Sequence, residues 1–444
     1  MSATITLKQI NRLAIPALIS GVSEPILSLT DAAIIGNMPH NATVSLAAIG
    51  IVTTFLSMLI WVLGQTRSAI SSIISQYVGA KNITAVKNLP AQAIVLITAL
   101  SVLIIVGTYP FATSIFKFYN ASGDVLNYSV AYYKIRVFGF PFTLFTIAVF
   151  GTFRGLQNTY YPMVIASVGA LINIGLDVVF VYGINGLIPA MHIKGAAYAS
   201  VSAQVIMALL SGYYMLKKTD IPLLIRLPFN PEIKRFVLMI GHLFIRTLAL
   251  NLALFLGTRF ATKYGENYIA AYTIAINLWF LGAFLIDGYA SAGNILSGKL
   301  LGAKAYKNLI SLSNKLIKYG IYVGLIIAII GAVLYYPIGN LFSNDKAVLD
   351  EFYAIFWMIL AMQPLCALAF IFDGVFKGLG EMRYLRNVLL ASTLLVFVPI
   401  LLISNYLDYK LYGIFIAFTF WILARGLPLI IKFRKTFTSL AQNP

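Results

Sequence analysis

Long runs of apolar residues dominate the chain, and short polar, glycine- or proline-containing segments separate them. A helix needs about 20 mostly apolar residues to cross a bilayer. Several runs exceed this length, so tilted or protruding helices are expected. The predicted spans are residues 10–35, 45–76, 86–113, 125–153, 160–182, 195–216, 233–258, 267–298, 308–336, 347–377, 384–405 and 410–431. The pattern therefore predicts an all-α polytopic membrane protein with twelve transmembrane helices.

Composition supports the same class of protein. Hydrophobic residues make up 60% of the 444 residues and charged residues only 10%, whereas about a quarter of the residues in a soluble domain are charged. These values exclude an ordinary soluble enzyme, a disordered chain and a coiled coil.

The chain has a net charge of +18, and the positions of its basic residues explain this excess. The basic residues are spread over short loops, without a basic cluster interleaved with aromatic residues, so no nucleic-acid partner is expected. The N-terminus and the even-numbered loops carry about three times as many Lys and Arg residues as the odd-numbered loops, which places them in the cytoplasm by the positive-inside rule. We therefore expect an integral protein of the cytoplasmic (inner or plasma) membrane with both termini in the cytoplasm.

The two halves of the chain repeat each other at one constant offset, which is the separation between Arg12 and Arg235. Each half holds six predicted helices, so both enter the membrane in the same sense and form a parallel repeat. We expect two six-helix lobes, residues 1–216 and 233–444, joined by a cytoplasmic linker at 217–232 and related by a pseudo-twofold axis along the membrane normal. The matching segments are Arg12 with Arg235, Ala47-Ala48 with Ala270-Ala271, Gly79-Ala80-Lys81 with Gly302-Ala303-Lys304, Pro141 with Pro364, and Phe153-Arg154-Gly155 with Phe376-Lys377-Gly378.

Polar and acidic residues inside the predicted spans of the first half are candidates for a functional site. A carboxylate in a membrane helix is costly and by default marks function. Glu24 and Asp31 lie seven residues apart on one face of the first helix, and Asn173 and Asp177 lie four apart on one face of the fifth. Ser200 lies near the start of the sixth helix.

Asp31, Asp177 and Ser200 are predicted at similar depths in the membrane. Asp31 lies 19 residues beyond Arg12, roughly 28 Å along a straight helix. Asp177 lies 17 residues beyond Tyr160, roughly 25 Å. Both residues, with Ser200, are therefore predicted in the outer half of one lobe, where their oxygens could form one site.

Two close carboxylates in a dry environment cannot both stay ionised without a cation. Either a proton is shared by the pair, which then titrates as a unit, or Na⁺ binds between the oxygen ligands of Asp31, Asn173 and Asp177. An alternative is a structural ion pair with Lys134 or Arg136 of the fourth helix. No cofactor is expected; the coupling ion would be H⁺ or Na⁺.

In the second half, Asp287 and Asp373 are each followed by glycine and fall toward the cytoplasmic ends of their helices. They could gate the cytoplasmic mouth, but we favour a structural role in which they bond to nearby backbone or basic side chains.

Two prolines, Pro16 and Pro25, interrupt the first helix. Proline removes a backbone hydrogen bond and kinks a helix. Because Pro25 lies between Glu24 and Asp31, protonation of either carboxylate could change the bend; fixed kinks are the alternative.

Several segments together resemble one known family over nearly the whole chain. They are Leu29-Thr-Asp31-Ala-Ala-Ile-Ile-Gly36, Asn173-Ile-Gly-Leu-Asp177, Gly195-Ala-Ala-Tyr-Ala-Ser200, the loop from Arg154-Gly155 to Pro162, Asp287-Gly-Tyr-Ala-Ser-Ala and Asp373-Gly-Val-Phe-Lys-Gly. The sequence resembles the MATE (multidrug and toxic compound extrusion) antiporters, and the last two segments are similar to the DinF-like branch.

The resemblance implies export of organic cations or other amphipathic compounds, including drugs and metabolites, against inward H⁺ or Na⁺. It implies that Asp31, Asn173 and Asp177 form a cation site with a helix-6 hydroxyl, here Ser200 where threonine is usual. Pro16 matches a proline implicated in bending. Glu24 is an additional carboxylate where the family has a neutral residue, and the second-lobe acids of the NorM-like branch have no match.

Three other functions are compatible with a polytopic membrane protein. A flippase for lipids or lipid-linked oligosaccharides on a related fold is the main alternative. A membrane-embedded enzyme is poorly supported, because the chain has neither His-Glu-x-x-His nor Gly-x-Ser-x-Gly. A channel is disfavoured because the acids lie in one lobe and do not line a symmetric pore. We therefore expect an antiporter, not an enzyme, that contacts membrane lipid, carries a small molecule and functions as a monomer.

Overall fold

The computed structural model describes residues 5–38, 41–184, 187–343 and 345–442, and for residues 23–29 it describes the backbone only. Glu24 and Pro25, two of the predicted site residues, therefore lie outside the described side chains.

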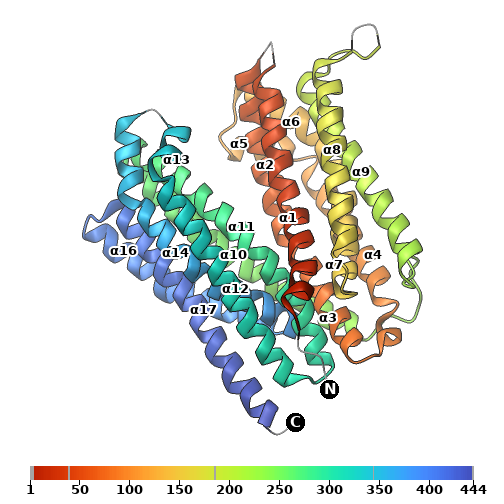
Figure 1. Ribbon diagram of the computed structural model, residues 1–444. Coiled ribbons are helices and arrows are strands. Elements are labelled where there is room, and N and C mark those ends of the chain that lie inside the picture. The colour runs from red at the N-terminus through yellow and green to blue at the C-terminus, as the bar shows by residue number, and fades with distance from the viewer. Residues whose placement is uncertain (1–4, 39–40, 185–186, 344, 443–444) are drawn as a thin grey trace. The chain divides into compact units, whose positions relative to one another are not determined.

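The described chain is helical in almost every segment, as Figure 1 shows. The α-helices are α1 (Leu7–Gly36), α2 (Ala42–Leu63), α3 (Thr66–Gly79), α4 (Leu89–Thr108), α5 (Ala112–Phe118), α6 (Gly123–Arg136), α7 (Phe140–Gly155), α8 (Tyr160–Tyr182), α9 (His192–Lys218), α10 (Glu232–Tyr264), α11 (Glu266–Gly302), α12 (Tyr306–Val333), α13 (Tyr335–Phe342), α14 (Lys346–Leu379), α15 (Met382–Ala391), α16 (Val398–Tyr406) and α17 (Lys410–Gln442). Short 3₁₀ helices η1 (Ile83–Val86) and η2 (Val137–Gly139) and a π-helix η3 (Ser392–Phe397) complete the list.

Membrane-crossing segments account for most of this helix. Within the described ranges, 11 helical segments are long and apolar enough to span a bilayer. They coincide with the second to twelfth predicted spans, and α1, with 30 residues, corresponds to the first. The predicted all-α polytopic fold is confirmed.

The internal repeat is visible in the elements themselves. Helix α3 ends at Gly79 and α11 at Gly302, which are separated by the offset of the repeat, and the short helices α5 and α13 begin at Ala112 and Tyr335 with the same separation. The residues that follow the first pair of helix ends, Lys81 and Lys304, both have left-handed backbones, with φ of 56° and 53°. The same chain reversal is therefore made twice.

Glycine contacts repeat as well. A Cβ added at Gly151 would lie 2.7 Å from the carbonyl oxygen of Arg67, and one at Gly374 would overlap the carbonyl oxygen of Ala290. Each glycine and each partner in this comparison is displaced from its counterpart by the offset of the repeat. The absence of a side chain thus lets helix backbones approach closely at equivalent places in both halves.

By its internal contacts the chain divides into two units. The N-terminal unit contains residues 19–74 and 82–237, and the C-terminal unit contains residues 1–18, 75–81 and 238–444. Helix α1 belongs to both units, because the division falls after Leu18.

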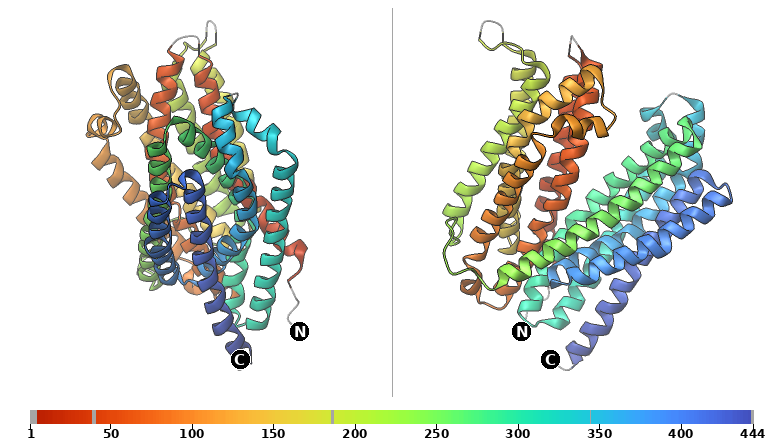
Figure 2. Two further views of the ribbon diagram at one scale, coloured as in Figure 1. Left: turned by 90° about the vertical axis from the view of Figure 1, so that its left-hand side faces the viewer. Right: turned by 180° about the vertical axis from the view of Figure 1, so that it is seen from behind.

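Within the N-terminal unit, α8 and α9 pack side by side, and α6 packs on α2 and α9 (Figure 1). Within the C-terminal unit, α14 packs against α11, α12 and α17, around a core rich in large aromatic side chains such as Trp421 and Phe372. Both views of Figure 2 show α17 extending beyond the other helices of its unit at its C-terminal end. These bundles fix the positions of the buried polar residues.

Candidate functional site

Four predicted residues of the first half come together inside the N-terminal unit. We call Asp31 of α1, Asn173 and Asp177 of α8, and Ser200 of α9 the acidic site. All four are buried; the exposed fraction is 7% for Asp31 and 0% for Asp177. Three helices that are distant in the sequence therefore present oxygen-bearing side chains to one interior position.

A chain of hydrogen bonds connects these side chains. The Asn173 amide donates through Nδ2 to Asp177 Oδ2 at 3.0 Å and to Ser200 Oγ at 3.5 Å. The Ser200 hydroxyl donates to Asp31 Oδ2 at 3.5 Å. The two 3.5 Å contacts are long for hydrogen bonds, so Ser200 connects Asp31 only loosely to Asn173, the partner of Asp177.

The carboxylates are left incompletely paired. Asp31 and Asp177 lie within interaction range of each other. Oδ1 of each is buried and has no hydrogen-bond partner among the described residues. A buried acceptor without a donor is costly. Both Oδ1 atoms are therefore available to interact with a proton or a cation.

Local packing explains why these helices meet here. Asn173 and Asp177 share one face of α8 because they are one turn apart. The start of α9 lies directly against α8, since a Cβ at Gly195 would overlap the carbonyl oxygen of Phe180. This approach places Ser200, further along α9, beside the α8 pair.

A tyrosine fixes the end of α1 next to the acidic site. The Tyr182 hydroxyl, at the end of α8, donates to the Ile34 carbonyl oxygen at 2.8 Å. Because Ile34 lies three residues after Asp31, the bond holds that turn of α1 against α8. Sequence reasoning missed this contact, since nothing local to Tyr182 indicates a partner on the first helix of the chain.

Helix α6 contributes a cation and a phenol near the acidic site. Arg136 and Tyr132, one turn apart, both interact electrostatically with Asp31 and Asp177. No ion pair joins Arg136 to either carboxylate within the described part of the chain. Lys134, the other basic residue considered, is exposed and lies over the Tyr109 ring, 5.4 Å from its centroid. Arg136 therefore influences both carboxylates electrostatically without pairing directly with either of them.

The predicted bending proline lies close to the division between the units. Pro16 is half-buried in α1, two residues before Leu18, the last residue assigned to the C-terminal unit in this helix. Proline at this position removes one backbone hydrogen bond from the helix. The structure thus places a weakened turn where α1 leaves one unit for the other.

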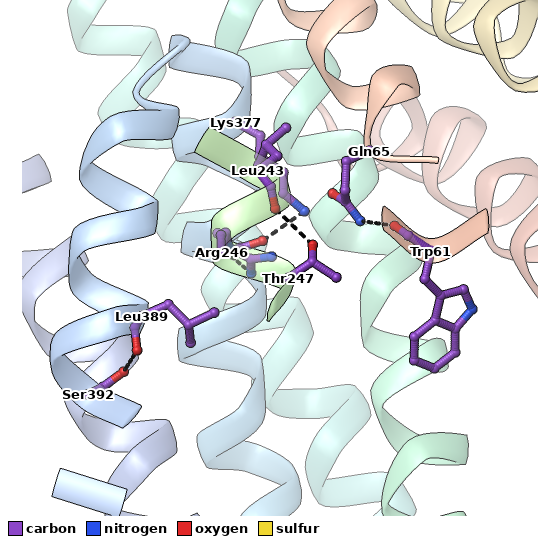
Figure 3. A network of polar contacts seen from close by, with 9 residues as sticks. Trp61, Gln65, Leu243, Arg246, Thr247, Lys377, Leu389 and Ser392 are labelled. Atoms are coloured by element: carbon purple, nitrogen blue, oxygen red, sulfur yellow. Dashed lines mark hydrogen bonds and ion pairs between the residues drawn. The ribbon is translucent and has the colours of Figure 1, made fainter. Parts of the chain in front are cut away.

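The second half buries the opposite charge. We call Arg246 of α10, Asp373 and Lys377 of α14, and Arg425 of α17 the basic cluster. Arg246 Nη2 donates to Asp373 Oδ1, and Lys377 Nζ lies 2.9 Å from Asp373 Oδ2. Figure 3 labels Arg246 and Lys377 of this cluster. Arg425 interacts electrostatically with Arg246 and Asp373.

Sequence reasoning singled out Asp373 but missed both arginines of the basic cluster. Arg246 and Arg425 lie inside predicted spans, and an arginine at membrane depth is a signal of function or pairing. That signal was sufficient to find them.

Asp287 has a different environment from Asp373. Its side chain is exposed in α11, and none of the ion pairs found in the described ranges includes it. Because a carboxylate facing hydrocarbon costs several kcal/mol, this face of α11 is expected to contact water.

Buried carboxylates in a bundle of membrane-crossing helices are typical of proteins that move ions or solutes across membranes. Fold and site together therefore define a polytopic membrane transporter. The chain belongs to the MatE family, whose model matches residues 16–179 and 243–403.

Curated relatives with this family resemblance span most of the chain. Protein DETOXIFICATION 42 of Arabidopsis thaliana is 25% identical over 89% of this chain and 86% of its own length. DNA damage-inducible protein F of Escherichia coli K12 is 25% identical over 96% and 92%. Multidrug resistance protein MdtK of Pectobacterium atrosepticum is 26% identical over 85% and 82%. The DinF-like resemblance of the sequence is confirmed.

Solved structures show the same fold. A crystal structure described as MATE in the bent conformation has a TM-score of 0.90 at 22% identity and covers 98% of this chain and 96% of its own. The outward-facing conformation of a multidrug resistance MATE transporter of the MOP superfamily has a TM-score of 0.86 at 23% identity, over 98% and 96%. These neighbours have twelve helices in two lobes, as predicted for this chain.

Proposed function

We propose that the protein is a cation-coupled antiporter that exports organic cations or other amphipathic drugs or metabolites by alternating access. Membership of the MatE family and similarity to multidrug resistance proteins support efflux as the activity. The acidic site supports coupling to a cation. The coupling ion would be H⁺ or Na⁺.

One observation carries this proposal: Asp31 and Asp177 are buried together, and each has an oxygen without a partner among the described residues. Two neighbouring carboxylates away from water repel each other unless a proton or metal cation neutralises one charge. A shared proton would turn one carboxyl into a donor for the other. Na⁺ would instead be held by the carboxylates together with the oxygens of Asn173 and Ser200, which suit a hard cation.

Coupling follows if the acidic site binds its cation in only one arrangement of the lobes. A ligand shifts a conformational equilibrium only through its different affinities for the two states. Asp31 lies on α1, which passes from one unit to the other next to Pro16. Binding at Asp31 would therefore act on the bend of a helix that both units share, and substrate would favour the other arrangement.

The positive-inside distribution supports a protein of the cytoplasmic membrane with both termini in the cytoplasm. Two lobes in one chain support a functional monomer with residues 1–216 and 233–444 as the moving lobes.

The decisive test replaces the two carboxyls separately. Asp31→Asn and Asp177→Asn should each lower gradient-driven dye efflux from proteoliposomes at least about 100-fold, because a coupling site has no substitute for its ionisable groups. Gel filtration should show both variants folded. Normal efflux by both variants would refute the acidic site as the coupling site.

The same proteoliposomes identify the coupling ion. Imposing a pH gradient or a Na⁺ gradient alone should drive efflux in only one case. Asp124→Asn provides a matched control, because Asp124 lies in the first turn of α6 near the surface of the N-terminal unit. Its efflux should equal that of the wild type.

A lipid or lipid-linked oligosaccharide flippase is the second candidate, and the basic cluster favours it. Buried arginines suit the phosphate of a lipid head group. Movement of a labelled phospholipid between leaflets without efflux of soluble dye would select this function over drug export.

A further inference from the structure

The basic cluster has fewer negative charges than positive ones. Asp373 is the one carboxylate among its four residues, and both oxygens of Asp373 are already engaged, Oδ1 by Arg246 and Oδ2 by Lys377. The cluster therefore carries an excess of two positive charges. An unbalanced buried charge is strongly unfavourable unless a counter-ion is supplied.

Two arginines of the cluster have donors to spare. Arg246 is only 4% exposed, and its Nε is buried without an acceptor within the described part of the chain. Arg425 is 5% exposed, and no hydrogen bond from its guanidinium to a described residue is found. Guanidinium groups match the planar oxygens of carboxylate, sulfonate and phosphate groups.

Arg425 is held in position by aromatic rings. Its guanidinium lies 4.7 Å from the Trp421 ring centroid and 5.4 Å from that of Phe370. The Trp421 indole is itself fixed, because Nε1 donates at 3.0 Å to Thr393 Oγ1 in the π-helix η3. π-helical turns are rare and occur frequently at functional sites. The cation is thus preorganised beside apolar ring surface.

We propose that the basic cluster binds the anionic group of an amphipathic substrate, with Arg246, Lys377 and Arg425 as its ligands. The substrates would then include organic anions or zwitterions that carry a carboxylate, sulfonate or phosphate. This inference specifies the substrate class of the antiporter and rests on the proposed function.

Binding to the purified protein tests the cluster without requiring transport. Carboxyfluorescein and rhodamine 6G share a xanthene body and carry opposite charges, so fluorescence anisotropy compares the anion with the cation. Carboxyfluorescein should bind, and Lys377→Gln and Arg425→Gln should each weaken its binding at least tenfold while leaving rhodamine 6G unchanged. Arg425→Lys should recover part of the affinity, because it keeps the charge but loses the planar fork.

Lys432→Gln is the matched control. Lys432 is on α17 like Arg425, but it pairs with Glu381 at 3.0 Å and lies outside the basic cluster. Lys377→Gln keeps the Arg246–Asp373 pair, so it tests the proposal even if Arg425→Gln does not fold. Equal binding of both dyes, or equal losses in Lys377→Gln and Lys432→Gln, would overturn the proposal.

Transport separates this inference from the proposed function. Gradient-driven efflux of carboxyfluorescein supports both. If carboxyfluorescein binds through the cluster but neither dye is exported, the anion site is retained and the antiporter function is refuted. If rhodamine 6G is exported but no anion binds, the antiporter function is retained and the anion site is refuted.

A lipid-translocation assay tests whether the anionic group belongs to a lipid head group. Movement of labelled phosphatidylglycerol between leaflets, faster than that of phosphatidylcholine and lowered by Lys377→Gln, supports the cluster with a lipid ligand.

Discussion

The two halves of this protein share their backbone packing and differ in the charge that they bury. Glycine contacts recur at the same offset in both halves, yet the N-terminal unit encloses Asp31 and Asp177 and the C-terminal unit encloses Arg246 and Arg425. A duplicated scaffold has therefore been combined with opposite electrostatics. The close approach of helices depends on small residues, whereas the buried charges can change without altering it.

The difference separates two ways of keeping charge in a membrane protein. In the basic cluster, both oxygens of Asp373 have basic partners, so this carboxylate is neutralised by the protein itself. In the acidic site, each aspartate keeps an oxygen without a partner among the described residues, and the nearby Arg136 forms no ion pair with either of them in the same part of the chain. The first carboxylate is suited to a permanent role and the second pair to a reversible one.

Loss of Asp373 should give the largest effect on stability. Asp373→Asn would leave three cations without a counter-charge, and breaking a buried pair costs about 3–5 kcal/mol. Asp177→Asn should instead leave stability unchanged or raise it, because it removes a repulsion. Thermal unfolding can be followed with a thiol-reactive fluorophore, since Cys366 is the single cysteine and is buried. Equal shifts in both variants would contradict the difference between the two regions.

Cation binding should stabilise the protein through the acidic site alone. A ligand that binds only the folded state adds about 2.7 kcal/mol at 100 times its dissociation constant. Raising Na⁺ against choline at constant ionic strength, or raising the proton concentration, should therefore increase the unfolding temperature. The Asp31→Asn/Asp177→Asn double variant should lose this response and Lys377→Gln should keep it. A response retained in the double variant would place the cation elsewhere.

Equivalent glycines should matter equally in both halves. A methyl group at Gly155 would meet Ile74 at 2.6 Å, and one at Gly378 would overlap Ser297 and Asn294. Gly155→Ala and Gly378→Ala should each lower the free energy of unfolding by about 1–3 kcal/mol.

Gly50→Ala and Gly241→Ala are the controls for these substitutions, one in each half. A methyl group at either position meets no atom of the described residues within 4 Å, so alanine should be neutral or stabilise the helix by up to about 1 kcal/mol. A loss in only one half would show that the packing, like the charge, has diverged.

Ser200 should have the smallest effect. Its two hydrogen bonds are long, at 3.5 Å, and a typical bond contributes about 0.5–1.5 kcal/mol. Ser200→Ala should therefore weaken the cation response only a few-fold to about tenfold, and Ser200→Thr should preserve it because the hydroxyl remains. Complete loss of coupled efflux in Ser200→Ala would show that the hydroxyl is an essential ligand.

Much of the acidic site could be predicted from the chain because helix geometry is regular. Asn173 and Asp177, four residues apart, had to share a face of one helix, and residue counts gave Asp31 the same depth as Asp177. The partners of Tyr182 and Arg425 could not be predicted, because hydrogen bonds and ring contacts between distant helices depend on how those helices rotate and pack.

The sequence by itself determined the class of fold, the order of the helices and the repeat, because membrane spans need long apolar runs and a duplication leaves identical residues at a fixed separation. Only the tertiary structure decided which buried charges are paired. Pairing depends on short distances between side chains from different helices, and apolar periodicity places a helix in the membrane without specifying its neighbours.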